Sequence, residues 1–243
     1  MSTDTSHLTA LDEPRQLAAA ARSILACPAG VNLVVDGVED VLAGTADLGM
    51  QDLDGTPTFS CVPGSDLAAA AQIGASALLT LESGLGAPGS SDRAATLTLA
   101  GTLRVTARED CGCCGEARDI VELSITFALL ARTGSRPEQQ YRVPLAPFRS
   151  PDHRLNRGYL QRSVEHANHC HQEELRRAVA TTSGTRLSQV VGVALADLRP
   201  DGVLVHWVDL DGAHTRELTF ATPASTTEEL GELLRRQLHS GLC

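Results

Sequence analysis

The chain contains no lysine, and its 20 basic residues other than histidine are all arginine. This absence excludes lysine Schiff-base chemistry and the lysine-dependent phosphate loop of P-loop NTPases. The sequence also lacks the Gly-x-Ser-x-Gly and His-Glu-x-x-His motifs. It therefore does not support an α/β-hydrolase or a zinc protease of that type. Aromatic residues make up only 3% of the chain, which predicts aliphatic cores and few surfaces for stacking bases or planar cofactors.

Long apolar runs and a surplus of positive charge are missing as well. No stretch of about 18 apolar residues is long enough to cross a bilayer, and the N-terminus does not have the layout of a signal peptide. We therefore expect a cytoplasmic protein that keeps its seven cysteines mostly reduced. The net charge of -10 over 243 residues argues against nucleic acids and anionic membranes as partners, and it favours small molecules or proteins.

What is present in the first half is a series of short apolar stretches separated by turn residues. Apolar residues at helical spacing predict a helix over 14–26, with Pro14 in its first turn. Asp-Gly pairs predict tight turns between short strands. Residues 121–130 fit a helix or a strand. We expect strands at 31–35, 41–50, 56–62, 77–82 and 94–106, with a short helix over 65–73 that has Ser65 or Asp66 as its N-cap.

Many short strands with one inserted helix predict a small antiparallel barrel. The order of an Asp-x-Asp-Gly turn, a strand, a Ser-Asp-Leu-Ala helix and a Thr-Leu-x-Gly strand resembles the split barrel of the pyridoxamine-phosphate-oxidase superfamily over about 14–107. The resemblance implies a flavin mononucleotide (FMN) site and a homodimer, because a twofold partner usually covers the open half of such a barrel.

The second half carries three histidines within seven residues of a predicted helix over 153–180. Asp-Gly hairpin strands follow, and then a helix over 226–239 with Ser225 or Thr226 as its cap. This order resembles the small domain attached to split barrels in haem-utilisation proteins of the HugZ type. The expected fold is therefore α+β: an FMN-binding-type split β-barrel followed by a small α/β domain of helix, antiparallel hairpin and helix. The expected boundaries are a disordered N-terminus over 1–13, the barrel over 14–131, a linker over 132–150 and the small domain over 151–243.

Charge argues against FMN in this barrel. Its phosphate needs charge-assisted donors, yet the stretch between Ser23 and Asp92 contains no lysine, arginine or histidine and, with Asp92, nine acidic residues. Helix or backbone N–H groups can cradle an anion, and Arg93 or Arg104 can approach from a later strand. We keep Arg93 as the candidate cofactor-binding cation and expect purified protein to be colourless at flavin wavelengths.

The histidine helix supplies the other candidate cofactor residues. His166, Asn168 and His171 match the family pattern His-x-Asn-x-Asp-His, and Cys170 replaces the acidic residue. Helical periodicity places His171 in the apolar stripe, facing the core, and His166 on the opposite side. The resemblance implies haem as the cofactor. The alternative is a hydrogen-bonded structural histidine beside exposed ones.

A cysteine-rich loop is the second cluster of reactive side chains. Cys111, Cys113 and Cys114 lie within four residues, flanked by glycines, and Cys170 is the candidate for a fourth ligand. Thiolates suit a soft metal ion or a redox reaction. The usual zinc spacing of two Cys-x-x-Cys pairs is absent, so ordinary surface cysteines remain an alternative.

These observations favour a tetrapyrrole-associated homodimer that binds or degrades haem and does not use FMN. Two alternatives stay open. One is a non-catalytic protein-binding regulatory module, and the other is a flavin-dependent oxidoreductase of the pyridoxamine-phosphate-oxidase type. The sequence leaves open whether the protein is an enzyme.

Overall fold

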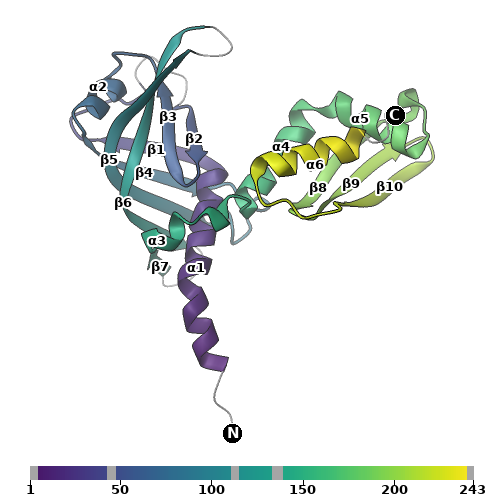
Figure 1. The fold of residues 1–243 in the computed structure, drawn as a ribbon, viewed down its shortest axis with the longest axis horizontal. Helices are drawn as coiled ribbons and strands as arrows, with labels where there is room; N and C mark the ends of the chain where they lie inside the picture. Colours follow the sequence, from purple (N-terminus) through teal and green to yellow (C-terminus); the bar gives the residue numbers. More distant parts are fainter. Residues whose placement is uncertain (1–4, 43–47, 111–114, 133–138, 240–243) are drawn as a thin grey trace. The chain divides into compact units, whose positions relative to one another are not determined.

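A computed structural model describes residues 5–239 apart from 43–47, 111–114 and 133–138 (Figure 1). The chain divides into two compact units, residues 1–153 and 154–243. We call them the sheet unit and the small unit and describe each by itself. None of the described helices is both long and apolar enough to cross a bilayer.

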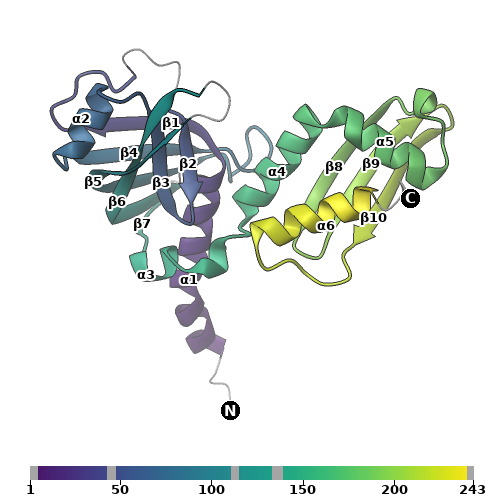
Figure 2. The same cartoon turned by 45° about the horizontal axis from the view of Figure 1, so that its top comes forward.

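The sheet unit is a curled antiparallel sheet with helices packed against it (Figures 1 and 2). The strand order is β1-β4-β5-β6-β3-β2, with β7 paired to β6. Its elements are α1 (Thr5–Ala26), β1 (Pro28–Val35), β2 (Met50–Leu53), β3 (Thr56–Cys61), α2 (Asp66–Gln72), β4 (Ser76–Ser83), β5 (Ala95–Asp110), β6 (Ala117–Arg132), β7 (Gln139–Arg142), α3 (Leu145–Phe148) and a 3₁₀ turn (Pro151–His153).

Alternating side chains form the core of this unit. In β4 and β5 every second residue is buried, as in Leu79, Leu81, Leu97 and Leu99, because successive strand residues point to opposite faces. Helix α1 contributes aliphatic side chains such as Ile24 to the same core. The antiparallel strand pairing, the curl of the sheet and the helix packed against it confirm the expected α+β class.

Local turn and cap signals predicted their elements well. The Asp54-Gly55 pair joins β2 to β3, and both residues have positive φ, as a tight hairpin turn requires. Ser65 caps α2 by accepting a hydrogen bond from the Ala68 N–H.

Three expectations differ from the structure in this unit. Helix α1 begins at Thr5 and contains Pro14 instead of starting with it. The strand expected over 41–50 is reduced to β2, which starts at Met50; part of that stretch lies outside the described residues. The expected linker over 132–150 contains β7 and α3, and Phe148 is fully buried in the core of the sheet unit. Phe148 is thus a core residue, despite the prolines around it.

The small unit packs three helices on one face of a three-stranded antiparallel sheet, in the order β10-β9-β8 (Figures 1 and 2). Leu175 and Val179 of one helix and Leu230 of another pack against Val203 and Val205 of the central strand. The elements are α4 (Arg157–Cys170), α5 (Gln172–Ser183), a 3₁₀ turn (Leu187–Gln189), β8 (Gly192–Arg199), β9 (Gly202–Asp209), β10 (Gly212–Thr219) and α6 (Thr227–His239).

Two predictions for this unit are corrected. The expected hairpin is a three-stranded sheet, because β8 also pairs with β9; the alternation of buried Val193 and Leu195 is the signal that was missed. The expected helix over 153–180 is two helices with a break at His171. The predicted cap of α6 is confirmed: Thr226 Oγ1 accepts from the Glu229 N–H while the Glu229 carboxylate accepts from Ser225.

Candidate functional site

The two histidines of the predicted site meet at the break between α4 and α5. At His171 the backbone leaves the helical region, with φ −118° and ψ 30°. The Nε2 atoms of His166 and His171 lie 3.2 Å apart, and the rings meet edge to face with centroids 5.0 Å apart. Both side chains are exposed. We call them the imidazole pair. The prediction that His171 faces the core is wrong, because it assumed one continuous helix.

The Asn168 side chain connects helix α4 to the edge of the sheet through two hydrogen bonds. Its side-chain Oδ1 accepts from the Leu195 N–H at 2.7 Å, and its Nδ2 donates to the Leu195 carbonyl at 2.9 Å. Gln172 Nε2 donates to the Val193 carbonyl farther along the same strand. These side chains satisfy the free edge of β8, which would otherwise present unpaired backbone groups. Both polar atoms of the Asn168 amide are therefore engaged in the structure of the small unit.

Asn168→Ala is expected to lower the free energy of unfolding by about 1–3 kcal/mol, because two hydrogen bonds are lost at the edge of β8. Asn168→Asp should not restore the stability, since a carboxylate accepts from the Leu195 N–H but cannot donate to its carbonyl. Urea denaturation of both variants measures the effect, with His169→Ala on the exposed side of α4 as the matched control. A loss no greater than that of the control would contradict the role of Asn168 in connecting α4 to the sheet.

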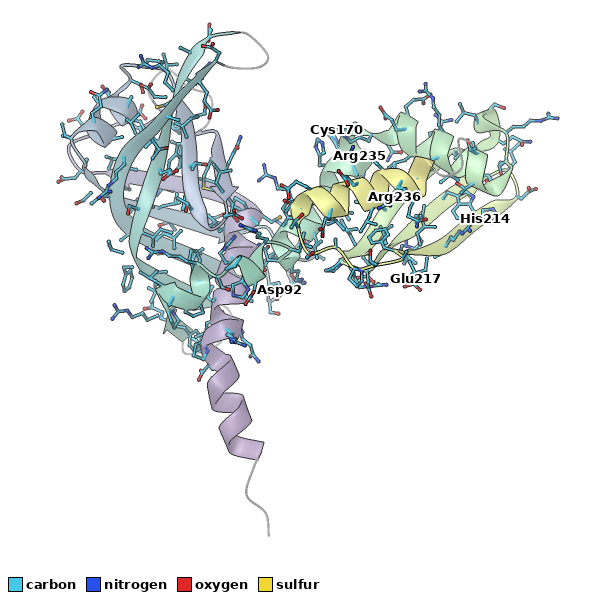
Figure 3. The ribbon with its side chains drawn as sticks, in the orientation of Figure 1. Asp92, Cys170, His214, Glu217, Arg235 and Arg236 are labelled. Carbon is cyan, nitrogen blue, oxygen red and sulfur yellow. The ribbon has the colours of Figure 1, made fainter. Side chains whose placement is uncertain are left out.

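The predicted cysteine site is tested only in part. Cys111, Cys113 and Cys114 lie outside the described residues. Cys170 is a free, exposed thiol at the end of α4, on the helical side of the small unit (Figure 3). Among the residues that the structure describes, no three His, Cys, Asp or Glu side chains gather to hold a metal ion. The four-cysteine metal site stays a prediction.

Two arginines close in sequence to the cation-free stretch, Arg93 and Arg22, are engaged in contacts within the sheet unit. Arg93 Nε donates to the Gly86 carbonyl at 3.3 Å and so closes the loop between β4 and β5. Arg22, one residue before the cation-free stretch, is 2% exposed, and its guanidinium donates to the Phe148 carbonyl and lies 3.7 Å from Asp52. Sequence reasoning missed this buried cation. Its partners neutralise it, so the argument against an FMN phosphate at the early strands is retained.

The loop held by Arg93 reads Gly-x-Gly-x-x-Gly over 84–89. A dinucleotide-binding fingerprint needs such a loop between a strand and the start of a helix. Here the loop joins antiparallel β4 to β5. Gly84 allows two backbone segments to approach each other, because a Cβ there would lie 2.4 Å from the Cys27 carbonyl oxygen. The match therefore indicates no nucleotide site.

A surface groove of about 460 Å³ lies in the small unit between α4 and β8. We call it the α4–β8 groove. Leu160, Val164 and Leu198 form its apolar part. Arg199, on its rim, is bonded to Asp197 and Glu217 and lies 3.4 Å from Asp201. The polar lining residues are Arg157, Gln161, Asp197 and Arg199.

The groove and the imidazole pair occupy different sides of α4. His166 follows Val164 by two residues and so lies about 200° around the helix from it. None of the described residues lining the groove is a histidine. The structure therefore places this apolar surface on a different side of α4 from the candidate cofactor residue His166.

A polar cluster closes the β9–β10 hairpin. The His214 imidazole stacks on Trp207 with centroids 5.0 Å apart, and its Nε2 lies 2.8 Å from the buried Asp209 carboxylate. The hydrogen bond from His214 is the main cause that holds the pKa of Asp209 below its ordinary value, with the Asp211 N–H adding to it. Stability from this cluster is therefore present above the ordinary pKa and is lost as the pH falls through the depressed one. His214 and Glu217 both project from β10 (Figure 3).

Comparisons with known proteins give distant structural neighbours only. No family model and no curated protein matches the chain. A heme binding protein from Mycobacterium smegmatis aligns at 14% identity over 93% of this chain and 97% of its own, with a TM-score of 0.39. A protein described as general stress protein 26 from Jannaschia sp. CCS1 aligns at 14% identity over 49% of this chain and 80% of its own, with a TM-score of 0.33. These scores establish no family, and the proposal below rests on the geometry of this chain.

Proposed function

We propose that the chain binds a tetrapyrrole that carries two carboxylates, such as haem, in the α4–β8 groove. The observation that carries the proposal is the combination of an apolar surface, Leu160, Val164 and Leu198, with arginines at its rim. Small-molecule sites are concave and mostly apolar, with a few polar groups that fix orientation, and commonly span about 300–1,000 Å³. The groove volume of about 460 Å³ falls within this range.

Two guanidinium groups line the groove beside the Asp197 carboxylate, and they suit carboxylates attached to an apolar body. Arg157 is exposed at the start of α4, and Arg199 adds a second guanidinium. Guanidinium groups pair with carboxylates in a bidentate geometry. We assign a carboxylate contact to Arg157 and test it there, because substitution of Arg157 leaves the ion pairs of Arg199 with Asp197, Asp201 and Glu217 in place.

The residues of the groove fit the macrocycle and its carboxylates better than they fit iron. No histidine is among its described lining residues. The proposal therefore assigns recognition to the organic part of the ligand and assigns no reaction. It predicts that haem and metal-free protoporphyrin IX bind with similar affinity.

Arg157→Glu tests this assignment. It is expected to weaken protoporphyrin binding about tenfold or more, since the loss of one charge-assisted hydrogen bond corresponds to at least about 1.4 kcal/mol. Arg162→Glu is the matched control, because it makes the same charge change on the side of α4 away from the groove. Protoporphyrin fluorescence measures the affinities. Equal weakening in the two variants would point to long-range charge instead of a groove contact.

A second comparison separates the groove from the histidines. Binding that requires iron and is lost in His166→Ala or His171→Ala would contradict the proposal, because these side chains lie outside the groove. Protoporphyrin dimethyl ester, which lacks the carboxylates, should bind Arg157→Glu and unmodified protein equally.

A further inference from the structure

We infer that the imidazole pair, His166 and His171, is a chelating site for a divalent first-row transition metal ion. The site is independent of the α4–β8 groove and of tetrapyrrole binding. The pair forms because α4 ends at Cys170. The change of backbone direction at this point brings His171, five positions after His166, close to the His166 ring. In one continuous helix the two residues would lie about 140° apart around the axis.

The distance between the two nitrogens suits one ion. The Nε2 atoms lie 3.2 Å apart. An ion about 2.05 Å from each, the usual zinc–imidazole distance, would make an N–metal–N angle of about 100°, close to the tetrahedral angle. A hydrogen bond between neutral imidazoles already requires one Nε2 without a proton. For both Nε2 atoms to bind one ion as neutral imidazoles, the donor ring must move its proton from Nε2 to Nδ1, so that each ring presents an Nε2 lone pair.

The surroundings permit and favour a cation. Both imidazoles are exposed, so a hydrated ion can reach them without a change of fold. The segment 163–175 contains Glu165, Glu173 and Glu174 and no arginine. Glu173 is ion-paired with Arg177 and Arg176. Glu165 and Glu174, set against Arg162 one turn before His166, leave a small net negative charge that favours a positive ion near the pair.

The site is expected to be open and exchangeable. No third His, Cys, Asp or Glu of the described residues joins the two imidazoles, so water would fill the remaining positions. Structural zinc sites use four protein ligands, and catalytic ones use three. Two ligands predict a weaker site whose preference follows the general order of affinities, with copper(II) bound more tightly than nickel(II), cobalt(II) or zinc(II).

The test uses the full chain, without a histidine tag and stripped of metal. Titration with copper(II) and zinc(II) should show one metal ion bound per chain. Its affinity should fall at least tenfold in His166→Ala and in His171→Ala. His169→Ala, an exposed neighbour on α4, should change the affinity less than twofold. The copper(II) electron paramagnetic resonance spectrum should show coupling to imidazole nitrogens, and either variant of the pair should lose this signature.

Thiols are the main competing ligands. A variant with Cys111, Cys113, Cys114 and Cys170 all replaced by serine should still bind a metal ion at the imidazole pair. Loss of this metal ion in the serine variant, or unchanged binding in His166→Ala, would overturn the inference. Circular dichroism shows whether each variant is folded. Haem is absent throughout, so a failure of the tetrapyrrole proposal does not affect the outcome.

Discussion

Replacing Arg22 with leucine is expected to lower the free energy of unfolding by about 3–5 kcal/mol, the usual cost of removing one partner from a buried ion pair. Arg22 is 2% exposed and connects three parts of the sheet unit. It projects from α1, donates to the Phe148 carbonyl at the end of α3, and lies 3.7 Å from Asp52 of β2. Leucine would leave the Asp52 carboxylate buried without its cation. Chemical denaturation followed by far-ultraviolet circular dichroism measures the loss.

The double variant Arg22→Leu/Asp52→Asn separates charge from packing. If the unpaired carboxylate causes most of the loss, removing its charge should recover a substantial part of the stability. Arg15→Leu, a more exposed arginine of the same helix, is the control and should change stability by less than about 0.5 kcal/mol. A similarly small effect of Arg22→Leu would contradict the role assigned to this side chain.

The same pair predicts an unusual pH dependence. Burial is the largest influence on Asp52 and raises its pKa above the ordinary 3.8, while Arg22 opposes the shift. A carboxyl with a raised pKa in the folded state contributes stability below its unfolded pKa and loses it as the pH rises through the folded value. Without Arg22 the shift grows. Arg22→Leu should therefore lose more stability between about pH 4 and pH 7 than the unmodified protein does.

Gly101→Ala is expected to cost about 3 kcal/mol, at the upper end of overpacking effects. Gly101 sits where the register of β5 against β6 shifts. A Cβ there would lie 2.1 Å from the Ser124 carbonyl oxygen and 2.7 Å from its carbonyl carbon. These are backbone atoms of the paired strand, so no side chain can move aside. Thermal unfolding of the variant should show a clearly lowered midpoint.

Gly30→Ala is the matched control for this substitution. Gly30 also lies in a strand of the sheet unit, and the nearest atom to its added Cβ is the Glu82 carboxylate at 3.0 Å. That flexible side-chain end can shift at little cost, so a small change in midpoint is expected. Equal changes in the midpoint at the two positions would contradict this account. They would show that replacing any strand glycine, and not the clash of the added Cβ with the β6 backbone, lowers the stability.

Signals carried by neighbouring residues predicted much of the fold. The Asp54-Gly55 turn and the caps of α2 and α6 depend on residues within four positions of one another, and the structure contains them. Buried Leu79 and Leu97 follow from strand alternation. The sequence also indicated that a cation-free stretch spans the early strands.

Features that depend on tertiary contacts could not be predicted in this way. The break at His171 is not marked by glycine or proline in the sequence, and without it the imidazole pair does not form. Arg22 looks like an ordinary helix charge until Phe148 and Asp52 are brought to it. Asn168 matches a family pattern, yet its amide pairs with Leu195, which lies 27 residues away. His166, Asn168 and His171 were therefore predicted as one group, and they are found as an amide bonded to the edge of β8 and, separately, an exposed imidazole pair.

Parallel titrations of haem and FMN into the same protein test the central claim most directly. Trp207 is the single tryptophan and belongs to β9 of the small unit, so its fluorescence reports a ligand that absorbs nearby. We predict saturable one-to-one quenching by haem, weakened by Arg157→Glu, and no saturable response to FMN. Tight stoichiometric binding of FMN, with no saturable binding of haem, would contradict the account.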